Sequence, residues 1–156
     1  MADHSVQREA LVIAAPPETC VAVATDVERY PEWAHDLKEA TVLERDAQGQ
    51  PLRVAFRAAA FGRSTDYRLR YNFSGLPEVI SWVLEEGDMT RKLDGSYTFN
   101  PVPGEPEATE VLYLLEVELV MPLPNIVKTR TERKIIHTAL RDLKARVEQL
   151  HAAAGA

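Results

Sequence analysis

The sequence predicts an α+β fold, in which a curved antiparallel sheet of about seven strands packs around one long C-terminal helix. Two short helices are expected after the first strand. Alternating apolar and polar segments follow one another through the middle of the chain, separated by short turns. An apolar stripe at helical spacing occurs near the C-terminus. A chain of 156 residues also suits one domain, spanning residues 1–156.

The first strand is expected at Ser5–Ala14, where Val6, Ala10 and Val12 share one parity. Pro16-Pro17 ends this strand and opens a helix over Glu18–Thr25, because proline suits the first helical position. A second helical turn begins at Asp26, a good capping residue, and stops at Pro31.

Six further strands are predicted in quick succession. They are Leu37–Glu44, Leu52–Ala59, Thr65–Phe73, Val79–Glu85, Met89–Asn100 and Glu110–Met121. Gly95 is expected to form a bulge, and the proline-rich residues 101–106 are expected to form a loop. The strands are apolar on only one side, which is typical of an antiparallel sheet with one wet face.

The last helix is expected to begin near Pro124 or Asn125, to end near His151, and to be followed by a frayed tail at 152–156. At ~1.5 Å per residue it spans roughly 40 Å, enough to cross the sheet. Its apolar stripe consists of Ile136, Ala139, Leu140, Leu143, Val147 and Leu150.

The N-terminal half of this helix is less regular. Extending the stripe backward places Arg133, Glu132 and Thr129 on the inner face. Either this half faces a water-filled or ligand-filled space, or the helix is rotated and Ile126, Val127 and Ile135 cover the sheet. The pattern leaves both alternatives open.

Composition limits the class of protein. The net charge of −6 and the pI of about 5.3 argue against general nucleic-acid binding, which needs a basic surface. Neither a signal peptide nor a membrane-spanning run is evident, so the cytoplasm is the expected compartment. Cys20, in an apolar helix, is expected to be a buried, inert thiol.

The order of elements, with the residues Asp26, Tyr30, Pro31 and Trp33, resembles the polyketide cyclase/dehydrase and START-like lipid-binding superfamily. Further resemblance lies in Gly95, Pro103-Gly104, Pro122 and Pro124. It covers nearly the whole chain and is strongest to small actinobacterial-type proteins, which suggests a bacterial source. It implies the helix-grip fold and a hydrophobic cavity, in a superfamily that contains both cyclases and non-catalytic carriers.

The predicted ligand site is rich in aromatic residues that share the inward strand parity and can stack on flat ligands. The residues expected to contact a ligand are Trp33, Phe56, Tyr67, Tyr71, Trp82, Arg91, Tyr97, Phe99, Tyr113, Met121, Arg133 and Ile136.

Two of these residues have an orientation that the pattern leaves open. Arg91 shares the parity of Tyr97 and Phe99, but a bulge at Gly95 would turn it outward. Arg133 would face inward only if the helix keeps the orientation of its C-terminal stripe. An inward arginine could orient a ligand carboxylate or ketone.

Catalytic machinery is not evident. Tyr67, Tyr71, Arg91 or Arg133 could stabilise an enolate, but no convincing base accompanies them. His35 and His137 are expected in a loop and on the helix surface. No metal-ligand spacing and no cofactor motif occur, so no metal or cofactor is expected.

Three functions therefore compete. The favoured one is binding or transport of a small hydrophobic ligand, such as a lipid, polyketide or quinone, by a monomer or homodimer. The second is a polyketide aromatase/cyclase or dehydratase that uses pocket Tyr and Arg groups. The third is a protein-interaction module that uses Leu112 and Leu114 on the outer face of the last strand.

Overall fold

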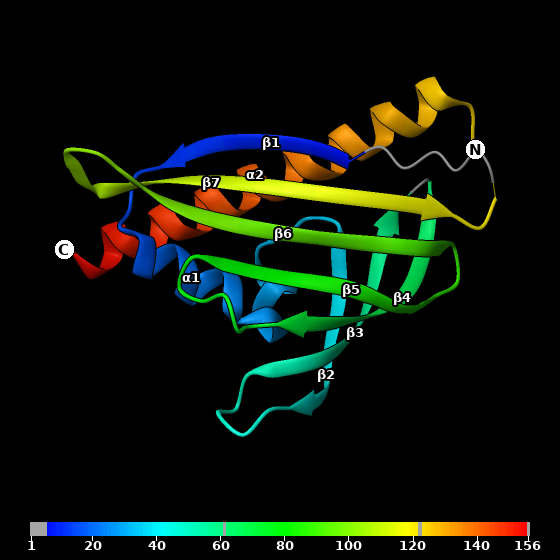
Figure 1. Ribbon diagram of the computed structural model, residues 1–156, viewed down its shortest axis with the longest axis horizontal. Coiled ribbons are helices and arrows are strands. Elements are labelled where there is room, and N and C mark those ends of the chain that lie inside the picture. Colours follow the sequence, from blue (N-terminus) through cyan, green and yellow to red (C-terminus); the bar gives the residue numbers. More distant parts are fainter. Residues whose placement is uncertain (1–5, 61, 122, 156) are drawn as a thin grey trace.

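A strongly curved sheet wraps around one side of a long helix in this protein (Figure 1). The structure is a computed structural model that describes residues 6–60, 62–121 and 123–155. All seven strands pair antiparallel in the order β1-β7-β6-β5-β4-β3-β2. The expected α+β, helix-grip architecture is confirmed.

The element bounds agree closely with the sequence prediction for most of the chain. They are β1 (Val6–Ile13), α1 (Pro17–Thr25), η1 (Val27–Glu32), β2 (Leu37–Arg45), β3 (Pro51–Ala60), β4 (Arg63–Asn72), β5 (Val79–Gly87), β6 (Thr90–Val102), β7 (Glu105–Leu119) and α2 (Asn125–Ala154). The last helix extends three residues beyond His151, through most of the expected tail.

Strand β1 lies at the edge of the sheet beside β7, so the first and last strands are neighbours. The helices α1 and η1 connect β1 to β2, the strand at the opposite edge, and lie inside the curve with α2 (Figure 1). Ser5 of the predicted first strand lies outside the described residues. Within β1, Val6, Ala10 and Val12 point to solvent, because the opposite parity faces α2.

The main core lies where α2 crosses β1 and β7 and contacts α1. Its stripe residues Ile136, Leu140, Leu143 and Val147 are at most 1 % exposed. Cys20 of α1 is fully buried in the same core, and burial raises the pKa of its thiol, as expected for an inert group.

The predicted bulge at Gly95 is absent from the pairing of β6 with β7, whereas the pairing of β6 with β5 ends at Gly95. The register between β6 and β7 runs without a shift through Gly95 and changes instead between Thr90 and Lys92. The extra residue there is Arg91, whose side chain is exposed. Thr90 consequently takes the buried place.

Glycine at position 95 has a different role. It pairs with Trp82 across β5 and β6, and the indole lies directly against it. A Cβ atom at position 95 would lie 2.5 Å from Cζ2 of Trp82 and 2.8 Å from the carbonyl oxygen of Leu114. Glycine is therefore required here by the close approach of a large ring.

The predicted loop at residues 101–106 is also wrong. Strand β6 continues to Val102 and β7 begins at Glu105, so only Pro103 and Gly104 form the turn. Gly104 has φ of 78°, which a tight hairpin turn requires. The result is a long ribbon that extends past the rest of the sheet (Figure 1).

The N-terminal half of α2 fits neither of the alternatives left open by the sequence in full. Glu132 faces inward and is fully buried, and its Oε2 atom lies 2.9 Å from Nζ of Lys128, one turn earlier. Arg133, Ile126 and Val127 are exposed, so the rotated arrangement does not occur. A buried ion pair, rather than apolar contact, fills this part of the inner face.

Replacing Gly95 with alanine tests the contact with Trp82. Because the added methyl group would overlap the indole ring and a backbone oxygen, we expect Gly95→Ala to lower the free energy of unfolding by about 2 kcal/mol or more. Urea unfolding followed by circular dichroism measures this. Ser96→Ala, one residue along on the outer face, is the control and should change stability by less than about 0.5 kcal/mol. Equal effects of the two substitutions would contradict the steric role of Gly95.

Candidate ligand-binding cavity

A cavity of about 150 Å³ lies between the concave face of the sheet, the end of η1 and the middle of α2. Its walls come from every strand between β2 and β7, so it depends on the curvature of the whole sheet. The side chains that define it are Tyr30, Trp33, Ala34, Phe56, Ala58, Tyr67, Leu69, Tyr71, Trp82, Leu93, Tyr97, Tyr113, Ile135, Thr138, Ala139 and Asp142.

Aromatic rings form a connected wall. Trp82 lies 5.9 Å from Tyr71, 5.4 Å from Tyr97 and 5.7 Å from Tyr113, measured between ring centroids. On the other side Phe56 lies 5.5 Å from Tyr67. These distances are within the range of favourable ring contacts, and the rings present apolar faces to a guest.

The tyrosine hydroxyls are the main polar groups in this wall. Tyr30 donates its hydroxyl hydrogen to the carbonyl oxygen of Ala24. Among the described residues, the hydroxyls of Tyr67, Tyr71, Tyr97 and Tyr113 have no hydrogen-bond partner. The fully enclosed side-chain atoms without a partner in the described residues are Thr90 Oγ1 and Glu132 Oε1, and no tyrosine hydroxyl is among them. The four hydroxyls therefore reach the cavity space and are available to a guest molecule or to water.

Burial keeps these phenols protonated. It is the largest cause that raises the pKa of Tyr71, Tyr97 and Tyr113 well above the ordinary value of about 10. The other tyrosines add to the effect, since a second phenolate nearby would repel the first. The wall therefore offers neutral hydrogen-bond donors at any physiological pH.

Asp142 supplies a carboxylate to the cavity, with a side chain only 13 % exposed. The backbone N–H of His35 donates to Oδ2 at 2.8 Å, and Nδ1 of the same histidine lies 3.0 Å from Oδ1. The negative charge of Asp142, in addition to burial, raises the pKa of Tyr97. The histidine ring is exposed, so it orients the carboxylate from outside the cavity.

The mouth of the cavity is marked by Asp36 and Ala59, which are exposed although they line it. The backbone N–H of Ala59 donates to the carbonyl oxygen of Asp36 at 2.8 Å and joins the two sides. Among the described lining residues there is no lysine or arginine, and the charged groups are the carboxylates of Asp36 and Asp142. An anionic ligand group would therefore meet like charge.

Seven of the twelve predicted ligand residues line the cavity: Trp33, Phe56, Tyr67, Tyr71, Trp82, Tyr97 and Tyr113. Phe99 and Ile136 are buried in the core outside it. The expectation that Met121 faces inward is wrong, because β7 ends at Leu119 and Met121 is 73 % exposed. Arg91 and Arg133 are exposed and do not line the cavity.

Asp142 is one of the polar lining residues that the sequence analysis missed, with Asp36, Thr65, Thr90 and Thr138. It belongs to a second stripe on α2, at Ile135, Thr138, Ala139 and Asp142, which runs beside the core stripe at the same helical spacing. In the sequence, the position of a carboxylate at the edge of an apolar helical stripe could have indicated that Asp142 lines the cavity. His35 follows the Trp33 segment, as expected for a loop position.

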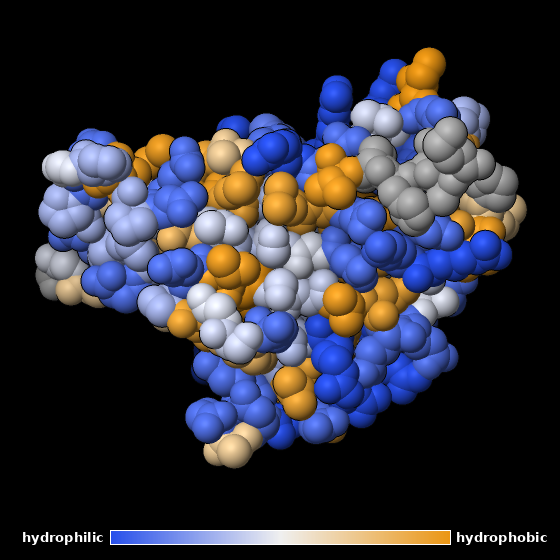
Figure 2. Space-filling view, viewed as in Figure 1, coloured by the Kyte–Doolittle hydropathy of each residue, from blue (hydrophilic) through white to orange (hydrophobic). Residues whose placement is uncertain are grey.

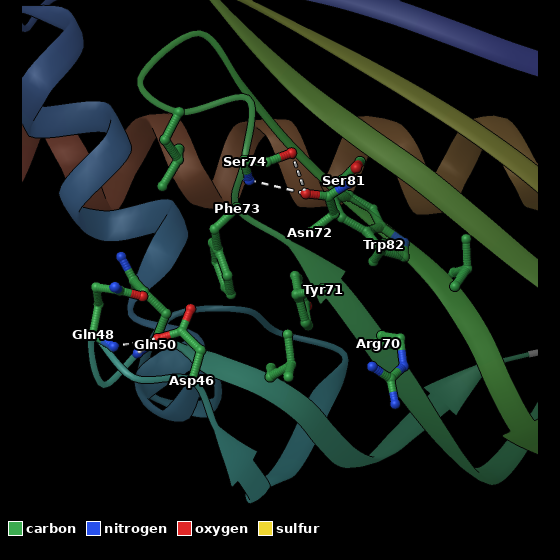
Figure 3. Close-up of a pocket in the computed structure, with 13 residues that line it drawn as sticks. Asp46, Gln48, Gln50, Arg70, Tyr71, Asn72, Phe73, Ser74, Ser81 and Trp82 are labelled. Carbon is green, nitrogen blue, oxygen red and sulfur yellow. Dashed lines mark hydrogen bonds between the residues drawn. The ribbon is translucent and has the colours of Figure 1, made fainter.

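A wider groove of about 790 Å³ lies outside the cavity (Figure 3). The turn between β2 and β3, with Asp46, Gln48 and Gln50, forms one side. Tyr71 and Trp82 line both spaces, so these two rings separate the groove from the cavity.

A family model described as "Polyketide cyclase / dehydrase and lipid transport" matches residues 13–144 of this chain. The chain belongs to this family. Within the described residues, no group of histidine, cysteine and acidic side chains has the arrangement of a metal site. No described helix is long and apolar enough to cross a membrane.

Solved structures share the fold of this family member at low sequence identity. A START superfamily protein from Mycobacterium smegmatis superimposes with a TM-score of 0.87 at 24 % identity, over 94 % of this chain and 99 % of the other. The Zhui aromatase/cyclase from Streptomyces sp. R1128 gives 0.80 at 13 % identity, over 94 % of each chain. Among curated protein sequences none matches significantly.

A plant protein extends the same comparison. The ginseng major latex-like protein 151 from Panax ginseng superimposes with a TM-score of 0.69 at 11 % identity, over 93 % of this chain and 98 % of the other. At such identities the likeness establishes the fold alone.

The raised pKa values of the tyrosines predict a steep loss of stability in alkali. Their folded pKa values lie above the unfolded value, so their contribution is complete below about pH 10 and is lost as the pH rises toward the folded pKa values. Between the unfolded and the folded pKa, each tyrosine lowers the free energy of unfolding by up to roughly 1.4 kcal/mol per pH unit. We expect phenolate absorbance to rise together with the loss of near-ultraviolet circular dichroism.

The control is the same titration in urea, where the unfolded chain should ionise near pH 10. Phenolate absorbance that develops near that pH while the fold persists would mean that water hydrates the hydroxyls in the folded protein.

Proposed function

We propose that this protein binds a small, neutral, oxygenated ring compound in the cavity between the sheet and α2. The observation that carries the proposal is the set of four tyrosine hydroxyls without a protein partner in an otherwise largely apolar wall. A guest that covers these hydroxyls without bonding to them removes them from water, which costs about 1–3 kcal/mol for each group. A ligand with its own oxygen atoms removes that cost, and its ring stacks on the aromatic wall.

The charge of the cavity disfavours a fatty acid. The carboxylate of a fatty acid would face Asp142 and Asp36, with no cation among the described lining residues. Its acyl chain would also leave the hydroxyls unsatisfied. A phenol, quinone or polyketide-like ring avoids both penalties.

The size of the cavity sets the scale of the ligand. An apolar protein cavity of this volume is large enough for a molecule such as benzene. One ring or a compact pair of rings is therefore the expected ligand, and a longer molecule would extend through the mouth at Asp36 and Ala59. Family membership supports a carrier or binding role without naming the compound.

Binding of 2-naphthol, compared with naphthalene and laurate, tests the proposal by isothermal titration calorimetry. The two ring compounds differ by one hydroxyl. We expect 2-naphthol to bind at least tenfold more tightly than either alternative, because only it offers a ring and a neutral oxygen together. Equal or tighter binding of naphthalene would show that the tyrosine hydroxyls do not select the ligand.

Matched alanine variants locate the binding site. Ala139 lines the cavity and Ala145 lies on the exposed face of the same helix. Ala139→Phe fills the space and should abolish 2-naphthol binding, whereas Ala145→Phe should leave it unchanged. If binding survives Ala139→Phe in a folded protein, the ligand binds elsewhere.

A catalytic role is the second proposal, and Asp142 is the observation that favours it. Its carboxylate, oriented by His35, shares the cavity with neutral phenol donors. A carboxylate can take a proton next to a ketone while a phenol stabilises the enolate oxygen. This is the acid–base pair that an aldol cyclisation or a dehydration requires.

Exchange of the α-protons of 2-tetralone in heavy water tests this role by proton NMR. If Asp142 is a base, the wild-type protein should accelerate exchange, and Asp142→Asn should lower the rate at least about 100-fold while 2-naphthol still binds. His137→Asn, on the exposed face of α2, is the control. If the wild-type protein does not accelerate exchange, the catalytic proposal is excluded for this substrate and the binding proposal is unaffected.

A further inference from the structure

An apolar tip projects from the molecule where β7 leads into α2. It consists of Val120, Met121, Ile126 and Val127, which are 41 %, 73 %, 74 % and 44 % exposed. The first turns of α2 rise clear of the strands (Figure 1), and the space-filling view shows apolar surface at that projecting end (Figure 2). Isolated exposed apolar residues are ordinary, but four within the eight residues that lead from the end of β7 into the first turn of α2 indicate a contact surface.

Basic residues follow the tip on the same face of α2. With 3.6 residues per turn, Arg130, Arg133 and Lys134 lie on the side of the helix that carries Ile126 and Val127. All five are exposed. Among the described residues, none of the three cations has an ion-pair partner.

The neighbouring strand adds another cation to this end. The backbone N–H of Val120 donates to the carbonyl oxygen of Met89 at 2.9 Å, and Thr90 pairs with Leu119. Arg91, turned outward by the bulge, therefore lies beside the tip. It too has no ion-pair partner among the residues described.

Several cations elsewhere on the sheet are paired with carboxylates. On the outer face Arg53 lies 3.0 Å from Glu85, Arg57 lies 3.0 Å from Asp66, and both pairs satisfy their charges locally. Residues 120–134 hold four lysines or arginines and one glutamate, which gives this segment a net charge of +3. Because the whole chain has a net charge of −6, the remaining residues together carry −9. A basic end on an acidic protein favours approach to an anionic surface in one orientation.

We propose that the tip, formed by Val120, Met121, Ile126 and Val127 with the surrounding cations Arg91, Arg130, Arg133 and Lys134, docks on an anionic lipid bilayer. The cations on α2 lie one to two turns behind Ile126, about 6–12 Å along the helix axis. Apolar side chains inserted at the acyl boundary would thus hold the cations at the depth of the lipid phosphates. Four side chains are too few for a stable protein interface, which takes roughly 20–30 residues a side.

The position of the tip connects it with the cavity. Val127 precedes the lining residue Ile135 by eight positions on α2, about 12 Å along the axis. A docked molecule would hold the cavity close to the bilayer, where apolar ring compounds accumulate. The docking surface shares no residue with the proposed ligand contacts, so the two proposals can fail separately.

Vesicle sedimentation tests the proposal. The probes are vesicles of phosphatidylcholine alone and vesicles in which about one lipid in three is phosphatidylglycerol. We expect binding to the anionic vesicles only, weakening as salt is added. Absence of binding to anionic vesicles at low salt would overturn the proposal.

Three variants separate the contributions. The double variant Ile126→Ser, Val127→Ser should lose vesicle affinity by at least tenfold. The double variant Arg130→Gln, Arg133→Gln should lose about 25-fold, near fivefold for each charge. Val12→Ser, which removes a valine that is 49 % exposed on β1, is the control and should bind as the wild type does. Wild-type affinity in the first variant would refute the role of the tip.

A fluorescent label reports insertion directly. Because Cys20 is the single cysteine and is buried, an Ile126→Cys variant can be labelled selectively with nitrobenzoxadiazole. Its emission should shift to the blue with anionic vesicles, and the same label at Val12→Cys should not shift. Equal shifts at the two positions would overturn insertion of the tip. A concentration-dependent doubling of mass without vesicles, abolished by Ile126→Ser, would show instead that the tip contacts a second copy of the protein.

Discussion

A mismatch in width governs this structure: one helix has to cover the concave face of a seven-stranded sheet. A helix with its side chains is about 10–12 Å across, whereas seven strands spaced about 4.8 Å apart span roughly 29 Å. The stripe of α2 packs on β1 and β7, and η1 packs on β2 and β3, where Tyr30 stacks on Phe56. The central strands β4 and β5 have no helix of their own to cover them. The sheet closes part of this gap by curving, and large aromatic side chains close most of the remainder.

The cavity is what this filling leaves unoccupied. Trp82 can lie flat against the sheet only because Gly95 lacks a side chain, and the surrounding rings of Tyr71, Tyr97 and Tyr113 pack against it. Filling a gap with tyrosine instead of phenylalanine introduces hydroxyls. These hydroxyls lack partners among the described protein groups, so the same packing solution that completes the fold also produces a binding surface for an oxygenated guest.

Charge is divided among separate regions of the molecule. On the outer face of the sheet arginines and carboxylates neutralise one another, as at Arg53 and Glu85. The cavity and its mouth hold carboxylates, at Asp142 and Asp36, and the tip between β7 and α2 holds unpaired cations. Inside the N-terminal half of α2, Lys128 and Glu132 pair with each other, since either charge alone would be costly to bury.

The sequence by itself determined which residues of the central strands share a face. A strand has a period of two whatever its neighbours are, so the alternation from Thr65 to Phe73 was sufficient to place Tyr67 and Tyr71 inward. The same rule placed Tyr97 and Tyr113. Strand ends and register shifts do not follow from that period. Arg91 lies outside because of a bulge, and Met121 because β7 ends two residues earlier. Only the tertiary structure decided that Asp142 faces the cavity. A residue at the edge of a helical stripe is buried or exposed according to the position and rotation of the helix on the curved sheet.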